Sequence, residues 1–249
     1  MNDRPIGIFD SGLGGLTVLN AVHKLLPEEN LVYFGDSGRA PYGTKSKETI
    51  IKYTFQDINF LLSQKVKMIV IACNTASACS LESVRKAYDI PVVEVVGPGA
   101  KAAAAATRSG HIGVIGTPAT IASGVYERAI KNILPECRCE KKACPLFVPL
   151  VEEGWWNHEI SRLVAEEYLG KMRAAGVDSV VLGCTHYPLL SEVIQQVMGE
   201  RVVLINSARE VALAVRESLN ALGSRRDSQG AQGSVQFYTS DSVDKFAAL

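Results

Sequence analysis

The chain has 249 residues, of which 47% are apolar and 21% are charged, and its 26 acidic side chains balance its 26 basic ones. This length suits one large domain or two small ones, and either can bury a sizeable core. A neutral chain has no electrostatic drive toward nucleic acid or an acidic membrane surface, so we expect neither as a partner.

The N-terminus, MNDRPIGIFDSG, breaks into glycine and proline after a few apolar residues and lacks the apolar core of a signal peptide. No apolar run approaches the ~18 residues of a membrane span. We therefore expect a cytoplasmic protein whose six cysteines are reduced.

Short runs rich in β-branched residues recur along the chain, and most are continuous rather than alternating. This pattern is typical of parallel strands that are buried on both faces. The predicted strands, in chain order, are residues 6–9, 31–34, 68–72, 92–96, 112–115, 146–150, 179–182 and 202–205, with an edge strand at 235–238.

Amphipathic segments lie between these runs. The predicted helices are residues 13–26, 47–64, 118–132, 158–175 and 208–222. Thr117 and Pro118 suit a helix start, Gly176 suits a C-cap, and Ser207 with Glu210 forms a capping box. Alternating strands and helices predict an α/β fold with mostly parallel sheets flanked by helices.

Two pairs of segments repeat in the same order. Residues 6–12 (IGIFDSG) resemble 112–118 (IGVIGTP), and residues 69–75 (IVIACNT) resemble 180–186 (VVLGCTH). The repeats favour two pseudo-symmetric α/β domains. We expect a discontinuous first domain, residues 1–97 and 208–249, and a second domain, residues 98–207. The polar stretch 224–233 is expected to be a mobile surface loop.

Reactive or polar side chains follow several predicted strands. In open parallel sheets, ligands bind beyond the carboxyl ends of the strands. The turns there are Asp10-Ser11-Gly12, Cys73-Asn74-Thr75, Gly116-Thr117 and Cys184-Thr185-His186. A helix start favours a thiolate over a thiol, and its N–H groups can hold a carboxylate.

The repeats pair Cys73 with Cys184. Two thiols on opposite sides of a cleft between the domains suit inversion at a carbon acid, because one thiolate removes a proton from one face while the other thiol protonates the opposite face. In this hypothesis Asp10 assists Cys73, and His186 with Glu152 assists Cys184.

Each of these residues also has a structural alternative. A strand-end cysteine can be a small core residue, Asp10 a turn residue, His186 a helix-start hydrogen-bonding residue, and Glu152 a solvated neighbour of Glu153. The spacing of Cys137, Cys139 and Cys144 matches no standard zinc pattern, so we expect no metal. The stretch DSGLGG departs from both glycine-rich phosphate-loop patterns.

The segments GIFDSGLGGLTV, YFGDSGRAPYGTKS, ACNTAS, GTPATI, PLVEEG and GCTHYPLL together resemble the glutamate racemase family, from about residue 5 to about residue 222. The resemblance implies a racemase that interconverts L- and D-glutamate without a cofactor and supplies D-glutamate for peptidoglycan. It also implies an active site at the interface of two α/β domains, and a homodimer. A racemase of the same superfamily acting on aspartate or another amino acid is the alternative.

By this resemblance, Cys73 takes the proton from D-glutamate and Cys184 takes it from L-glutamate. Asp10, Glu152 and His186 match the family's assisting positions. The positions that match its substrate contacts are Asp10, Ser11, Tyr42, Gly43, Asn74, Thr75, Thr117, Thr120, Thr185 and His186. An amino-acid-binding protein without catalysis and a cysteine hydrolase or redox protein fit less well, since neither explains the paired cysteines.

Overall fold

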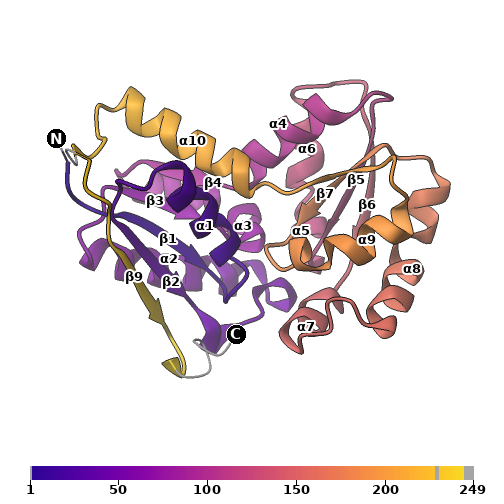
Figure 1. The fold of residues 1–249 in the computed structure, drawn as a ribbon, viewed down its shortest axis with the longest axis horizontal. Helices are drawn as coiled ribbons and strands as arrows, with labels where there is room; N and C mark the ends of the chain where they lie inside the picture. Colours follow the sequence, from indigo (N-terminus) through magenta and orange to yellow (C-terminus); the bar gives the residue numbers. More distant parts are fainter. Residues whose placement is uncertain (1, 228–229, 244–249) are drawn as a thin grey trace. The chain divides into compact units, whose positions relative to one another are not determined.

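The computed structural model describes residues 2–227 and 230–243, which divide into two compact units (Figure 1). Unit 1 comprises the described residues up to Val95 and from Ala208, and unit 2 is Val96–Ser207. The boundary expected after residue 97 falls inside the first helix of unit 2. No helix within the described ranges is both long and apolar enough to cross a membrane.

Unit 1 contains a parallel sheet of five strands in the order β4-β3-β1-β2-β9. Its inner strands are buried along their whole length, as the continuous apolar runs predict. The strands are β1 (Ile6–Asp10), β2 (Leu31–Gly35), β3 (Met68–Ile71), β4 (Val92–Glu94) and β9 (Val235–Thr239). The predicted edge strand is confirmed, because β9 pairs only with β2 among the described strands.

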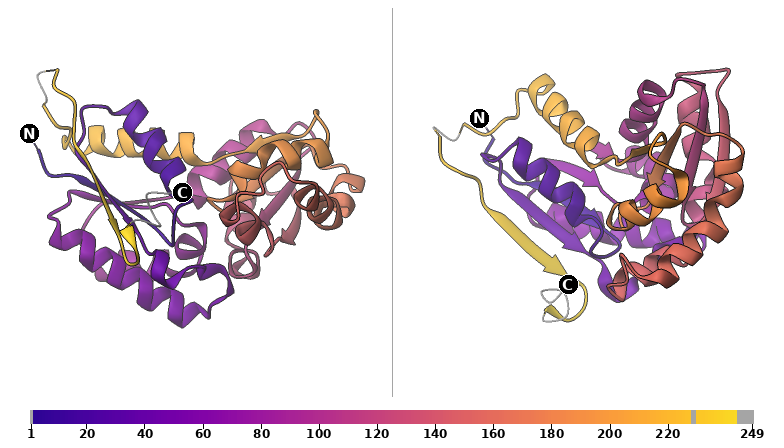
Figure 2. Two further views of the ribbon diagram at one scale, coloured as in Figure 1. Left: turned by 60° about the horizontal axis from the view of Figure 1, so that its bottom comes forward. Right: turned by 45° about the vertical axis from the view of Figure 1, so that its right-hand side comes forward.

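Two pairs of helices cover this sheet. α1 packs against α10, and α2 packs against α3; Figure 2 (left) shows α10 and α2 on opposite sides of the sheet. The helices are α1 (Leu16–Leu25), α2 (Lys47–Ser63), α3 (Asn74–Ala87) and α10 (Ala208–Ala221), with short 3₁₀ turns η1 (Ser37–Arg39) and η2 (Tyr42–Thr44) after β2.

Unit 2 contains a parallel sheet of four strands in the order β6-β5-β7-β8. The strands are β5 (His111–Gly116), β6 (Arg138–Ala143), β7 (Ser179–Gly183) and β8 (Val203–Ile205). α4 packs against α6 and β7, while α8 packs against α9 and β6. The helical elements are α4 (Val96–Ala106), α5 (Pro118–Ser123), α6 (Val125–Lys131), α7 (Phe147–Glu152), α8 (Glu159–Ala174), η3 (Tyr187–Leu190) and α9 (Ser191–Met198).

The two sheets share one strand order. In unit 1 the first strand lies between the second and third, with the fourth beside the third, and β5, β6, β7 and β8 repeat this arrangement in unit 2. The chain therefore reverses its direction across each sheet between the first and third strands. Such a switch point is where open parallel sheets bind ligands. The internal repeats predicted this duplicated architecture.

Two predicted elements of unit 2 are wrong. Residues 146–150 form no strand, because the helix α7 covers 147–152 and Pro149 sits in its first turn, where no N–H is needed. The strand of this region is β6, a half-exposed and charged edge strand that no apolar run marks. The helix predicted at 118–132 breaks into α5 and α6 at Gly124, whose φ is 64°.

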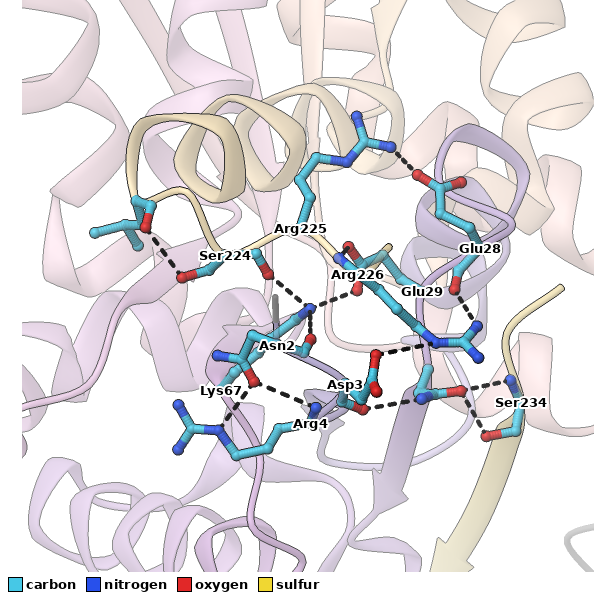
Figure 3. A network of polar contacts seen from close by, with 12 residues as sticks. Asn2, Asp3, Arg4, Glu28, Glu29, Lys67, Ser224, Arg225, Arg226 and Ser234 are labelled. Atoms are coloured by element: carbon cyan, nitrogen blue, oxygen red, sulfur yellow. Dashed lines mark hydrogen bonds and ion pairs between the residues drawn. The ribbon is translucent and has the colours of Figure 1, made fainter. Parts of the chain in front are cut away.

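A buried ion pair ties the N-terminal and C-terminal segments of unit 1 together (Figure 3). Lys67 Nζ donates to Glu29 Oε2 at 2.6 Å and to the carbonyls of Asn2 and Ser224, both at 2.8 Å. Glu29 Oε1 accepts the N–H of Arg226. The stretch predicted as a mobile loop is thus anchored at Ser224 and Arg226; residues 228–229 lie outside the described part.

Candidate functional site

Cys73 and Ser11 lie side by side at the switch point of unit 1. The register pairs Phe9 of β1 with Ile71 of β3. Ser11 comes two residues after Phe9 and Cys73 two residues after Ile71, so the two lie at the same level beyond the sheet. Cys73 Sγ donates to Ser11 Oγ at 3.5 Å. The two residues are only 4% and 9% exposed, respectively.

Cys73 is also the N-cap of α3. Its Sγ accepts the N–H of Ala76 at 3.4 Å, in the place where a serine or aspartate oxygen usually caps a helix. An N–H donor and the positive end of a helix both favour negative charge on the sulfur. Asn74 and Thr75 follow in the first turn of α3 and are buried.

Asp10 ends β1 and is fully buried. Its Oδ2 accepts the N–H of Gly12 at 3.0 Å, so it shapes the turn after β1. A Cβ at position 15 would lie 2.4 Å from Asp10 Cβ, so only glycine allows α1 to approach the carboxylate this closely. Burial raises the pKa of Tyr33 well above its usual value, and the charges of Asp10 and Cys73 raise it further, which places both groups near its ring.

Tyr42 and Gly43 are buried in η2, which packs against α3. Tyr42 Oη lies within hydrogen-bond distance of two buried carboxylates, Asp36 and Asp57. The sequence reasoning missed both aspartates. One signal was available for Asp36, because Asp36-Ser37-Gly38 repeats the triplet Asp10-Ser11-Gly12 at the end of the neighbouring strand. Asp57 lies inside a helix and carries no such signal.

Unit 2 places Thr117 and Cys184 at its own switch point. Gly116, the last residue of β5, pairs with Gly183, the last residue of β7. Thr117 and Cys184 follow directly after them. A Cβ at position 183 would lie 2.5 Å from the carbonyl oxygen of Ile115, so glycine is needed just before the cysteine. Cys184 is 7% exposed and belongs to the hydrophobic core of the unit.

Thr117 caps α5 and lies against Thr120. Thr117 Oγ1 accepts the N–H of Thr120 at 3.3 Å, and the two hydroxyls lie 3.0 Å apart. Both side chains are buried. The predicted helix start at Thr117 and Pro118 is therefore confirmed, and the pair of hydroxyls stands beside the end of β5.

Cys184, His186 and Glu152 form a row within unit 2. Cys184 Sγ lies 3.9 Å from His186 Nδ1, and His186 Nε2 lies 3.4 Å from Glu152 Oε1. His186 is 5% exposed, whereas the Glu152 side chain is 42% exposed. The imidazole can therefore pass a proton from the thiol toward a carboxylate that meets solvent.

Cys184 does not cap a regular helix, unlike Cys73. The 3₁₀ turn η3 follows it, and its carbonyl accepts the N–H of Tyr187 at 3.1 Å. Thr185 and His186 lie between the thiol and η3 and are buried. The expectation that each thiol lies at the start of a helix therefore holds for Cys73 only. At Cys184, the neighbouring polar group is the imidazole of His186.

Three further cysteines of unit 2 lie on β6 or next to its ends. Cys137 and Cys139 lie 3.7 Å apart, sulfur to sulfur, at the start of the edge strand β6. Cys144 Sγ donates to the carbonyl of Lys142, and burial raises the pKa of its thiol to about 12. Within residues 2–227 and 230–243, no three histidine, cysteine or acidic side chains gather in a way that would hold a metal ion.

The fold and these residues define a class: a parallel α/β protein with two like units, each of which carries a buried cysteine beyond the third strand of its sheet. The particular family follows from comparison with known proteins. Residues 15–215 match the Asp/Glu/Hydantoin racemase family, and the chain belongs to it.

Known relatives agree along nearly the whole chain. A glutamate racemase of Geobacter metallireducens is 52% identical over 238 residues, which are 96% of this chain and 88% of that protein. The crystal structure of glutamate racemase isoform RacE1 from Bacillus anthracis superposes with a TM-score of 0.95 at 37% identity, over 99% of this chain and 92% of that one. The glutamate racemase from Francisella tularensis in complex with D-glutamate superposes with a TM-score of 0.93 at 38% identity, over 100% of this chain and 92% of that one.

Proposed function

We propose that this protein is a glutamate racemase that interconverts L- and D-glutamate without a cofactor and supplies D-glutamate for peptidoglycan. The observation that carries the proposal is the pair of buried thiols, Cys73 and Cys184, at the same position of two sheets with the same strand order. The 52% identity to a glutamate racemase supports glutamate as the substrate.

The reaction needs a base and an acid on opposite faces of the α-carbon. One cysteine, as thiolate, removes the α-proton and leaves a carbanion stabilised by the substrate carboxyl group. The other cysteine, as thiol, donates its proton to the opposite face and becomes the thiolate. The thiol and thiolate have then exchanged roles, and the reverse reaction starts from the product.

Each thiol has groups that support its proton transfer. On the side of Cys73, the N–H of Ala76 and the start of α3 stabilise the thiolate. On the side of Cys184, His186 holds the proton between the sulfur and Glu152. By the resemblance to the family, Cys73 acts on D-glutamate and Cys184 on L-glutamate.

Glutamate offers two carboxylates and one ammonium group. The hydroxyls of Ser11, Thr75 and Thr185 and backbone N–H groups suit the carboxylates, and Asp10 suits the ammonium. Tyr42, Gly43, Asn74, Thr117 and Thr120 complete the substrate contacts. These side chains are buried in their own units, and a water-poor environment strengthens electrostatic stabilisation of the charge that develops during proton abstraction.

Four further parts of the proposal rest on the same family resemblance and the neutral net charge of the chain. They are a cytoplasmic location, a homodimeric assembly, no bound cofactor or metal, and no nucleic-acid partner. The thiols and their neighbouring side chains carry the proton transfers, so the proposed reaction requires no cofactor or metal.

The substrate is tested with purified protein and either L-glutamate or L-aspartate, without added cofactor. We expect L-glutamate to reach an equal mixture of both enantiomers, because enantiomers have the same free energy. L-aspartate should react at least about 10-fold more slowly, since a pocket discriminates one methylene by roughly 10–200-fold. Chiral chromatography measures both, and faster racemisation of L-aspartate would favour the alternative within the superfamily.

A further inference from the structure

A cluster of four polar side chains surrounds the hydroxyl of Tyr42 inside unit 1. The cluster consists of Asp36 at the end of β2, Arg39 in η1, Tyr42 in η2 and Asp57 in α2. The side chains of both aspartates are fully buried, and Arg39 is 28% exposed. The cluster therefore joins four separate elements around η2.

The hydroxyl of Tyr42 has more partners than protons. Tyr42 Oη lies 2.8 Å from Asp57 Oδ2 and also within hydrogen-bond distance of Asp36 Oδ2. A phenol has one proton to donate. If both carboxylates were ionised, one of the two contacts would bring unprotonated oxygens together in a buried site, which is strongly unfavourable. The geometry therefore requires one further proton.

The partners of the two carboxylates show where that proton lies. Asp36 Oδ1 already accepts from Ser240 Oγ at 2.7 Å and from Arg39 Nε at 2.9 Å, and its Oδ2 faces Tyr42. Asp36 thus has the surroundings of a carboxylate. Asp57 has one such donor, Arg39 Nη2 at 2.8 Å on Oδ1, which leaves Oδ2 to donate to Tyr42 Oη. One anion then faces one cation, and the cluster is neutral.

We propose that Asp57 holds a proton at neutral pH and, through Tyr42 and Asp36, positions η2 for substrate binding. This inference rests on the proposed function, in which Tyr42 and Gly43 contact glutamate. Asp57 is a positioning residue, because it acts through Tyr42. Loss of its proton would place two buried carboxylates against one phenol and would disturb η2.

The charges around Asp57 support its protonated form. Burial raises the pKa of Asp57, and the negative charges of Asp36 and Asp10 raise it further. The hydrogen bond with Tyr42 and the charge of Arg39 lower it in part, so that the pKa is about 8. These groups come from β1, β2, η1 and η2. α3 also packs against α2, and there Tyr88 bonds Asn59 instead. On α2 itself, the ring of Tyr53 contacts Tyr42 and Arg39.

The first test does not depend on activity. The carboxyl ¹³C signal of Asp57, assigned with Asp57→Asn, should titrate near pH 8 in the wild-type protein labelled at aspartate. A signal that titrates below about pH 5, in the ordinary range of an aspartate, would overturn the inference. The titration is followed on the folded wild-type chain. If the variant folds poorly, the absence of any aspartate signal that titrates near pH 8 would still overturn the inference.

Thermal unfolding gives a second readout, with the following sign. The unfolded chain loses the Asp57 proton near pH ~3.9, whereas the folded chain keeps it up to about pH 8. The folded state therefore binds more protons in this window, and wild-type stability falls as pH rises through it. Asparagine keeps a donor for Tyr42 without titrating. The Tm of Asp57→Asn minus that of the wild type should increase from pH 5 to 8 and level off above it.

Asp178→Asn in unit 2 is the matched control. Burial raises the pKa of Asp178, but hydrogen bonds from Thr107, Ser109 and Arg108 outweigh burial and lower it to about 2. Asp178 is therefore ionised in the folded and the unfolded chain from pH 6 to 9. The Tm of Asp178→Asn relative to the wild type should stay constant across that range. An equal trend in both variants would contradict a specific role of Asp57.

The pH dependence of the KM for L-glutamate tests whether the proton on Asp57 affects substrate binding through η2. If only the protonated form binds, the competent fraction falls about tenfold between pH 7 and 9 for a pKa of about 8, and the wild-type KM rises by about that factor. Asp57→Asn should lack this rise, although both proteins share any effect of the thiols. The same rise in the variant would overturn the positioning role.

Absence of D-glutamate from the wild type would instead defeat the proposed function, while the ¹³C signal still decides whether Asp57 holds the proton.

Discussion

Replacement of Cys73 or Cys184 by alanine should lower glutamate racemisation by about 10²–10⁴-fold, the usual contribution of a positioned acid or base. Each variant keeps one thiol, so it can remove or deliver a proton on one face only. Inversion requires both faces, and for that reason both variants should lose it in both directions. Chiral chromatography of D- and L-glutamate measures the loss.

The two variants should differ in the enantiomer that they still recognise. With Cys184 removed, Cys73 remains to exchange the α-proton of D-glutamate for solvent deuterium without inversion; with Cys73 removed, Cys184 should exchange L-glutamate. The control is Cys79→Ala, on the same helix as Cys73, whose thiol is half-buried and has a pKa raised by burial. Full racemisation by either active-site variant would contradict the two-base scheme.

Lys67→Met should lower the free energy of unfolding by about 3–5 kcal/mol, the cost of removing one partner from a buried ion pair. The variant leaves the fully buried Glu29 without its cation and the carbonyls of Asn2 and Ser224 without their donor. Urea unfolding followed by far-UV circular dichroism measures the loss. Both tryptophans, Trp155 and Trp156, lie in unit 2, so their fluorescence reports that unit separately.

Two comparisons separate the buried pair from a general effect of losing a lysine. Lys67→Met combined with Glu29→Met removes both charges and should cost less than Lys67→Met alone. Lys86→Met breaks an exposed pair with Glu82 and should change stability little. A small loss for Lys67→Met, similar to that for Lys86→Met, would show that the network in Figure 3 does not hold the terminal segments of unit 1.

The sequence predicts the strands whose side chains are buried on both faces. β1, β3 and β7 are continuous apolar runs, and their burial explains why the pattern identifies them. β6 escapes prediction because it lies at an exposed edge and carries the charged residues Arg138, Glu140, Lys141 and Lys142. Residues 146–150 are apolar because α7 packs into the core, and a short apolar run does not distinguish a buried helix from a buried strand.

The thiols and their nearest partners are also predictable, because they follow strand ends that the apolar runs mark. Cys73 with Ser11, and Cys184 with Thr117, stand together since the register of adjacent parallel strands brings their ends together. The partners of Tyr42 could not be found in this way. Helical spacing places Asp57 on the same face of α2 as Ile58 and Leu61, but nothing in the sequence indicates which side chains it meets there.

Deuterium incorporation tests the central claim most directly. L-glutamate is incubated with the purified protein in heavy water, without added cofactor, and the D-glutamate formed is analysed by mass spectrometry. The hydrogen delivered to the α-carbon should come from a thiol that exchanges with solvent, so the D-glutamate should carry deuterium at that carbon. D-glutamate that retains the original α-hydrogen, or no D-glutamate at all, would contradict racemisation by Cys73 and Cys184.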